Sequence, residues 1–185
     1  MDLTIFPKTS NQHLEVLNRP PKLTLEEFEA LEVSEAEQKL REQIYRLEER
    51  MHATPGTVDD KHMDEIGMTP VHRFVNGLYH RELTIPPGIV VVGKRHAIEH
   101  IVMLTAGYCL CATERGVEEM HAPMTFISPA GEKRVVFAGP EGCTWVTLHP
   151  TDKTDLEEIE RDVIIAEPAR QLKYEEVRRL TGEKP

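Results

Sequence analysis

Hydrophobic residues in this 185-residue chain follow one spacing near its start and another in its middle. Within residues 35–52 they recur every three or four positions, which places them on one stripe of a helix. The stripe consists of Leu40, Ile44, Leu47 and Met51. Ser34 and Glu37 precede it in the pattern of a capping box, which satisfies the first free amides of a helix. We predict a helix here, its stripe covered either by the rest of this chain or by a second subunit.

Further helices are predicted on both sides of the middle segment. Capping-box patterns also begin at Thr24 and Thr154. The first predicts a short helix over 25–32, and the second predicts a helix soon after Pro150. Residues 174–180 have the composition of a closing helix. The two ends of the chain are therefore expected to be helical.

Between these ends, over residues 71–150, apolar and polar positions alternate with a period of two. Short runs rich in Val, Ile and Thr are separated by Gly and Pro, as strands are by turns. The predicted strands are 72–76, 79–85, 89–93, 99–104, 107–113, 117–121, 124–128, 133–138 and 144–149. Many short strands at regular spacing are typical of a β-sandwich or β-barrel. We predict a mainly β protein with an acidic helical arm (1–70), a barrel (71–150) and a helical C-terminal extension (151–185).

Charge and composition exclude several kinds of partner. The net charge is −10, and the acidic excess lies outside residues 71–150. An acidic chain without a basic stripe is repelled by a phosphate backbone, so nucleic acid is not an expected partner. The apolar runs have the length of strands, and the N-terminus lacks the pattern of a secretory signal, so we expect no membrane span.

The cysteines fit a reducing compartment. There are three of them, an odd number that argues against a disulfide framework. Cys109 and Cys111 lie two positions apart in one predicted strand, so they share a face and are poorly placed to bridge each other. We predict that both are packing residues, and that the protein is cytoplasmic.

The most specific spacing in the chain lies within residues 88–107. Gly88 is followed by five residues and Lys94, then by one residue and His96. Three residues later comes His100, and six residues after that comes Gly107. A second frame follows at Pro129, Gly131 and Arg134.

These two frames resemble the two sequence motifs of the cupin superfamily. In that family, three histidines and one glutamate of the motifs hold a divalent metal in the mouth of a jelly-roll barrel. Here Lys94 and Arg134 stand at two of the histidine positions, and His100 stands at the glutamate position. The resemblance implies a single cupin barrel over residues 71–150 with an altered set of ligands. The segments HAIEH and SPAGEKR also resemble small cupin-type proteins encoded in tailed-phage genomes, which implies host cytoplasm or the virion as the location.

One interpretation of the site is a metal centre. His96 and His100 keep two of the motif's ligand positions, and a catalytic metal usually has three protein ligands with an open position. The third ligand would be His149, His121 or Glu99. Glu99 adjoins His100, so on a regular strand it points to the opposite face. The metal expected in such a site is iron, manganese, nickel or zinc.

A second interpretation is an anion pocket without metal. Lys94 and Arg134, if they project inward as the residues they replace would, raise the potential of the pocket and disfavour a dication. They would suit a small molecule that carries a carboxylate or phosphate. His96 or His100 would then be the candidate general base, so the sequence leaves open whether the protein is an enzyme.

A third interpretation assigns no chemistry to the barrel. The protein would be a structural or assembly protein, associated with a phage, in which the barrel is a scaffold and the helical arms contact other proteins. The altered ligand set and the long arms favour this alternative. On family grounds we also expect a homo-oligomer, at least a homodimer.

Overall fold

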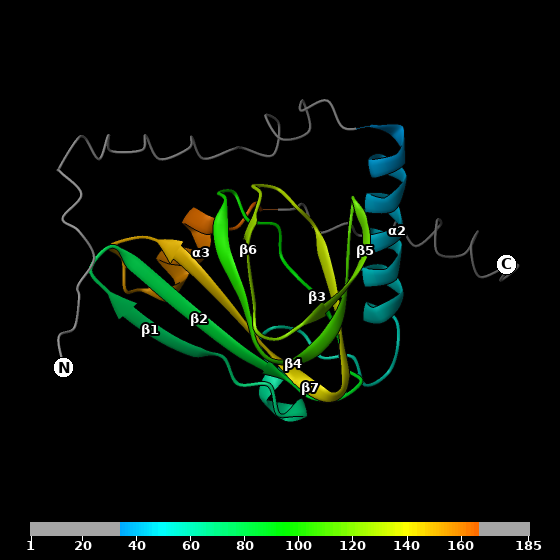
Figure 1. Cartoon of the computed structure of the whole chain (residues 1–185), viewed down its shortest axis with the longest axis horizontal. Helices are drawn as coiled ribbons and strands as arrows, with labels where there is room; N and C mark the ends of the chain where they lie inside the picture. The colour runs from blue at the N-terminus through cyan, green and yellow to red at the C-terminus, as the bar shows by residue number, and fades with distance from the viewer. Residues whose placement is uncertain (1–33, 167–185) are drawn as a thin grey trace, which may run out of the picture.

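The computed structural model describes residues 34–166, which form a β-barrel between two helices (Figure 1). Helix α2 (Glu35–His52) comes first, followed by the short 3-10 helix η1 (Met63–Ile66). The strands are β1 (Val71–Val75), β2 (Leu78–Ile85), β3 (Val90–Val92), β4 (His100–Thr113), β5 (Gly116–His121), β6 (Met124–Ser128) and β7 (Arg134–Pro150). Helix α3 (Leu156–Val163) follows them. The predicted fold class, mainly β with helices on both sides, is confirmed.

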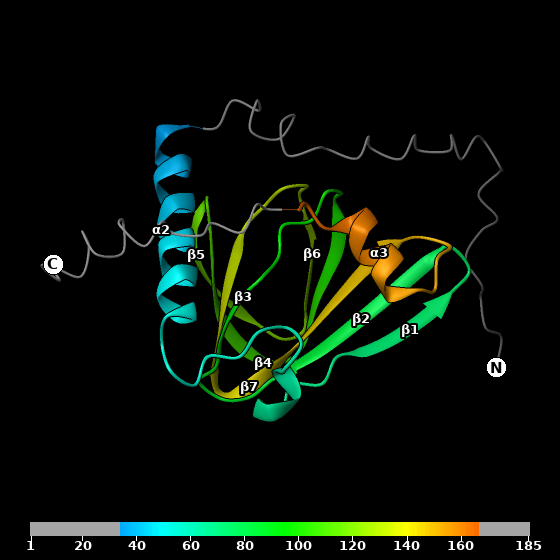
Figure 2. The same ribbon diagram turned by 180° about the vertical axis from the view of Figure 1, so that it is seen from behind.

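All strand pairs are antiparallel, and two long strands organise them. The main order is β1-β2-β7-β4-β5, with β3 added to β7 and β6 added to β4. Strand β7 pairs with β3 along its first part and with β2 along its second part. Strand β4 likewise pairs with β6 and then with β5. Because each long strand changes partner along its length, the sheet curves around a common interior (Figures 1 and 2).

The predicted strand breaks at Gly107 and at residues 139–142 are wrong, because the chain bends there without leaving the sheet. Gly107 and Gly142 both have positive φ, 70° and 76°, and the β4–β7 register shifts on either side of Gly107. A Cβ atom on Gly107 would overlap the carbonyl oxygen of Gly142. These glycines permit close approach of two backbones at a bulge, so each pair of predicted strands becomes one long strand.

The interior of the barrel is apolar and contains the cysteines. Its buried members include Leu83, Ile85, Val102, Leu104, Met120, Val136 and Trp145. Cys109, Cys111 and Cys143 are buried among them as free thiols. Burial raises the pKa of Cys111 to about 12, which keeps the thiol protonated and unreactive. The predicted packing role of Cys109 and Cys111 is confirmed.

Helix α2 has the predicted range and N-terminus, and it lies beside β5 (Figures 1 and 2). Ser34 and Glu37 form the capping box in both directions. On the apolar stripe, Ile44 is only 6% exposed, whereas Leu40 and Leu47 are half-buried. This single chain therefore covers the centre of the stripe.

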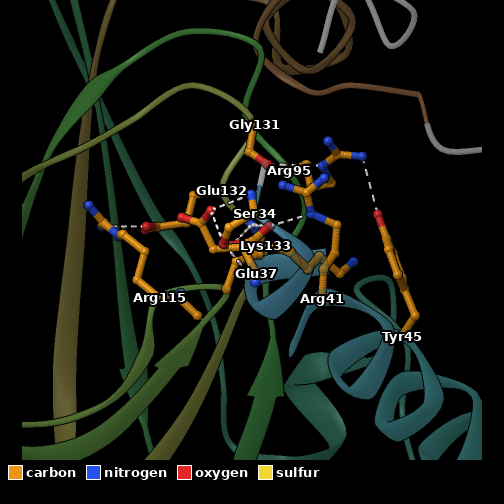
Figure 3. Close-up of polar contacts among 11 residues, drawn as sticks. Ser34, Glu37, Arg41, Tyr45, Arg95, Arg115, Gly131, Glu132 and Lys133 are labelled. Carbon is orange, nitrogen blue, oxygen red and sulfur yellow. Dashed lines mark hydrogen bonds and ion pairs between the residues drawn. The ribbon is translucent and has the colours of Figure 1, made fainter. Parts of the chain in front are cut away.

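Buried charges attach α2 to the barrel (Figure 3). The carboxylate of Glu114 accepts hydrogen bonds from Nε of Arg41 (2.9 Å) and from the backbone N–H of Lys133 (3.0 Å). Nζ of Lys133 donates to Glu48 of the helix at 3.0 Å. Nη1 of Arg95 donates to the hydroxyl of Tyr45 at 3.2 Å. The helix is thus fixed in position by charge-assisted hydrogen bonds as well as by Ile44.

Helix α3 closes one side of the barrel near β2 (Figure 2). The predicted cap at Thr154 is wrong by one residue, because the side chain of Asp155 accepts from the N–H of Glu158 at 2.9 Å. Ile159 and Val163 of the helix pack in a buried cluster with Tyr79. The helices predicted over 25–32 and 174–180 lie outside the described residues. Within 34–166, no helix has both the length and the apolar character needed to cross a bilayer.

Candidate metal and ligand site

Three histidines lie close together at the wall of the barrel interior, two from the segment that leads into β4 and one from β7. His100 begins β4 and His149 lies near the end of β7, where Ile101 pairs with Leu148. His96 precedes β4, and its carbonyl accepts a hydrogen bond of 2.7 Å from the N–H of Gly131. One ring nitrogen of each histidine lies within 4.8 Å of the others. The ring centroids are 4.2 to 4.8 Å apart. This spacing suits three ligands of one metal ion.

The hydrogen bonding of the three rings leaves nitrogen lone pairs available. Nδ1 of His100 is 3.2 Å from the carbonyl oxygen of Ile98. Donation to that oxygen assigns the proton to Nδ1 and leaves Nε2 as an acceptor. Nδ1 of His96 and Nδ1 of His149 are buried and have no hydrogen-bond partner among residues 34–166. Buried polar atoms are nearly always paired, so these two nitrogens are suited to act as ligands of a metal ion.

The protonation state of the cluster is also that of a metal site. Burial lowers the pKa of His100 to about 4 and the pKa of His149 to about 3. Burial, together with the neighbouring histidines and arginines, holds the pKa of His96 well below its ordinary value. All three imidazoles are therefore neutral at pH 7, and neutral imidazole is the form that binds metal ions.

The histidines line a cavity of about 370 Å³, a size suited to a small organic ligand. The neighbouring strands β2 and β7 supply much of its wall. Tyr79, Arg81 and Leu83 of β2 pair in register with His149, Thr147 and Trp145 of β7, and all six line the cavity. Ile159 of α3 lies at another side. The cavity thus combines apolar walls with a few polar groups.

The two predicted cationic ligands line this cavity, but carboxylates already pair with them. Nζ of Lys94 lies 2.6 Å from Asp60 and also contacts Glu160. Arg134 pairs with Glu132 and donates to the hydroxyl of Ser128 at 3.0 Å. Neither cation is therefore an unpaired positive charge for an incoming anion.

The three candidates for a third ligand lie in different places. His149 adjoins His96 and His100. His121 lies exposed on β5, where Nε2 is 2.9 Å from Glu119. Glu99 is exposed, and neither it nor His121 lines the cavity. Only His149 therefore joins the two motif histidines among residues 34–166.

Arg81 and Thr147 are cavity residues that the sequence reasoning missed. A signal was present, because Tyr79, Arg81, Leu83 and Ile85 alternate with polar residues, which places Arg81 on the apolar face of its strand. A charged residue on such a face points into the interior and calls for an explanation. Thr147 carries no comparable local signal.

Comparison with known proteins gives structural neighbours only. Neither a protein-family model nor a curated protein matches this sequence. Among solved structures, a cupin domain from Bordetella pertussis is 22% identical, with 46% of this chain and 94% of that chain covered and a TM-score of 0.38. A protein from Photorhabdus luminescens is 11% identical, with coverages of 51% and 83% and a TM-score of 0.42. A cupin-superfamily sugar phosphate isomerase from Silicibacter pomeroyi is 17% identical, with coverages of 46% and 60% and a TM-score of 0.40.

Proposed function

We propose that this protein is a cupin-type binding protein whose cavity holds a divalent transition metal and a small anionic molecule. His96, His100 and His149 would be the protein ligands of the metal. The observation that carries the proposal is the group of three neutral imidazoles whose ring nitrogens lie within 4.8 Å of one another. Three nitrogen donors favour zinc, iron or nickel over magnesium or calcium.

The charges around the cluster support a bound anion as well as a metal. Arg134 is neutralised by Glu132, but Arg81 has no ion pair within residues 34–166. A dication beside an unpaired guanidinium is unfavourable by Coulomb's law unless a negative group lies between them. An anionic ligand between them would reduce this repulsion, so metal and anion are expected to favour each other's binding.

The chemistry available at such a site is electrostatic activation of the bound molecule. A metal held by three imidazoles keeps open coordination positions and, when bound, acts as a Lewis acid on a ligand oxygen. The protein's own contribution is to orient the molecule against the histidines and to exclude water with the apolar side chains of Leu83 and Trp145. The three neutral imidazoles supply nitrogen donors without adding charge.

Metal analysis of the full-length protein tests this proposal. We expect about one equivalent of zinc, iron or nickel per chain after loading, because the three imidazoles form one site. His149→Ala and His100→Ala should each lower metal affinity at least tenfold, whereas the matched control His121→Ala should not alter it. Wild-type protein that takes up no metal, or equal losses in all three variants, would contradict the metal centre.

A second copy of the chain is the protein partner that we propose. Exposed apolar residues face each other across neighbouring strands, with Ile101 opposite Ile127 and Leu110 opposite Phe137. Such exposed apolar pairs are typical of surfaces that associate. A homodimer should therefore be seen by sedimentation, and Ile127→Lys should convert it to a monomer; a monomeric wild type would rule it out. The cytoplasmic location and the phage setting stay predictions from the sequence.

A further inference from the structure

Arg81 differs from the other cations of the cavity in having no close partner. Lys94 and Arg134 each contact carboxylates. The side chain of Arg81, by contrast, makes no hydrogen bond and no direct ion pair within the described residues 34–166, and the carboxylates of Glu160 and Asp60 act on it only through longer-range attraction. Its side chain is largely buried and lines the cavity. A guanidinium in such a place loses part of its hydration and gains no direct acceptor among residues 34–166, so a ligand that supplies one is favoured.

A second, independent observation lies directly opposite. Thr147 pairs in register with Arg81 across the β2–β7 ladder, so both side chains are on the same face of the sheet. Thr147 is 6% exposed, and its hydroxyl oxygen is buried without a hydrogen-bond partner in the described part of the chain. A buried hydroxyl is normally paired, so this position also lacks an acceptor. Two neighbouring hydrogen-bond donors thus face one cavity without an acceptor among residues 34–166.

We propose that Arg81 and Thr147 form the subsite for the carboxylate of a small monocarboxylic acid. The guanidinium would donate two parallel hydrogen bonds to the carboxylate, and the hydroxyl of Thr147 would donate a third. The subsite adjoins His149, which is the next cavity-facing residue after Thr147 on β7. This inference deepens the proposed function by naming its ligand class and the residues that select it.

The charge and the walls of the cavity favour a monocarboxylate over a phosphate. In the metal-free protein, a single guanidinium without a direct ion pair matches one negative charge, whereas a phosphate dianion would leave charge uncompensated in a largely buried site. The acidic side chains of Asp60, Glu132 and Glu160 also line the cavity and would repel a second negative charge. Leu83, Ile85 and Trp145 offer apolar surface for the rest of the molecule. An aromatic or aliphatic acid fits these features.

The test uses full-length protein, both as purified and after treatment with a chelator, and benzoate as the probe. Isothermal titration should give a dissociation constant on the order of 1 mM for a ligand of this size. Arg81→Gln should weaken benzoate binding about 10- to 100-fold, since a charge-assisted hydrogen bond is lost. Thr147→Val, which keeps the shape of the side chain, should weaken it about 3- to 10-fold.

Matched controls separate the subsite from general effects of charge. Arg73→Gln removes an arginine that pairs with Glu82 and does not line the cavity, so benzoate binding should not change. Arg81→Lys keeps the charge but not the planar fork and should give an intermediate loss. Benzamide, the neutral analogue of benzoate, should bind at least tenfold more weakly to the wild type.

Several outcomes would overturn the inference. They are no benzoate binding by wild type, equal losses in Arg81→Gln and Arg73→Gln, or tighter binding of inorganic phosphate than of benzoate. Metal content measured in the same samples separates this result from the proposed metal centre. Protein that holds metal but not benzoate refutes the carboxylate subsite alone. Protein that binds benzoate through Arg81 without taking up metal supports the subsite and refutes the metal centre.

Discussion

This protein buries charged and polar groups between α2 and the barrel and around the cavity, and two side chains of the cavity lack a direct partner within residues 34–166. Between α2 and the barrel, Glu114 receives hydrogen bonds from Arg41 and Lys133. In the cavity, the side chains of Arg81 and Thr147 have no hydrogen-bond or ion-pair partner within residues 34–166. A paired buried charge contributes to a specific structure, whereas an unpaired one reduces stability. The difference agrees with a structural role for the first region and with the proposed binding role of the second.

The largest effect is expected at the paired region. Glu114→Ala removes the buried carboxylate to which the guanidinium of Arg41 and the backbone N–H of Lys133 both donate. Removal of one partner from a buried charged network costs about 3 to 5 kcal/mol in the free energy of unfolding. Urea denaturation measures this change. Arg46→Ala, which removes an exposed pair with Glu42, is the control and should change stability by less than about 0.5 kcal/mol. Equal effects of the two substitutions would refute the structural role of Glu114.

The next largest effect is a pH dependence of stability that comes from the buried histidines of the cavity. The folded-state pKa of His100 is about 4 and that of His149 is about 3, both below the unfolded value of about 6.5. The free energy of unfolding is therefore highest above pH 6.5 and decreases as the pH falls toward 4, because over this range only the unfolded chain binds protons at these two histidines. At pH 5 the loss is roughly 2 kcal/mol for each histidine.

This dependence is measured by urea denaturation of metal-free protein at pH 7.5 and pH 5. His100→Gln should reduce the difference between the two pH values by roughly 2 kcal/mol, because glutamine does not titrate. His52→Gln is the control, since His52 is exposed at the end of α2. An unchanged difference in His100→Gln would mean that this histidine is not buried in its neutral form.

The sequence predicted those parts of the molecule that local signals specify. Helix α2 was found with its range and cap because apolar spacing and the residues Ser34 and Glu37 act within a few turns. The breaks at Gly107 and Gly142 were misjudged, because a glycine at a turn and a glycine at a bulge look alike in sequence. The two were distinguished only when β4 paired with β7, and that pairing depends on residues far apart in the chain.

The candidate site follows the same rule. His96 and His100 were named because they lie in one motif, but His149 could be named only as one of three alternatives. The direction of its side chain depends on the register between β4 and β7, which a local sequence pattern does not reveal. Lys94 and Arg134 were expected to be available to an anion, because the carboxylates that pair with them, Asp60, Glu160 and Glu132, could not be assigned before the fold was known. Arg81 meets Thr147 only through the β2–β7 pairing.

The smallest predicted change is a gain of stability, whereas the changes above are losses. It tests directly whether the cavity and the α2 region differ. Arg81→Met replaces an unpaired, largely buried charge by an apolar side chain of similar length. We expect the ligand-free protein to gain about 1 kcal/mol in stability, because the cost of burying the charge is removed. Lys94→Met is the matched control: its ion pairs with Asp60 and Glu160 would be lost, so the protein should become less stable by up to about 1 kcal/mol. Urea denaturation of both variants without ligand measures the two signs. A loss of stability in Arg81→Met would show that Arg81 contributes to folding like Glu114, and the division between the two regions would then be wrong.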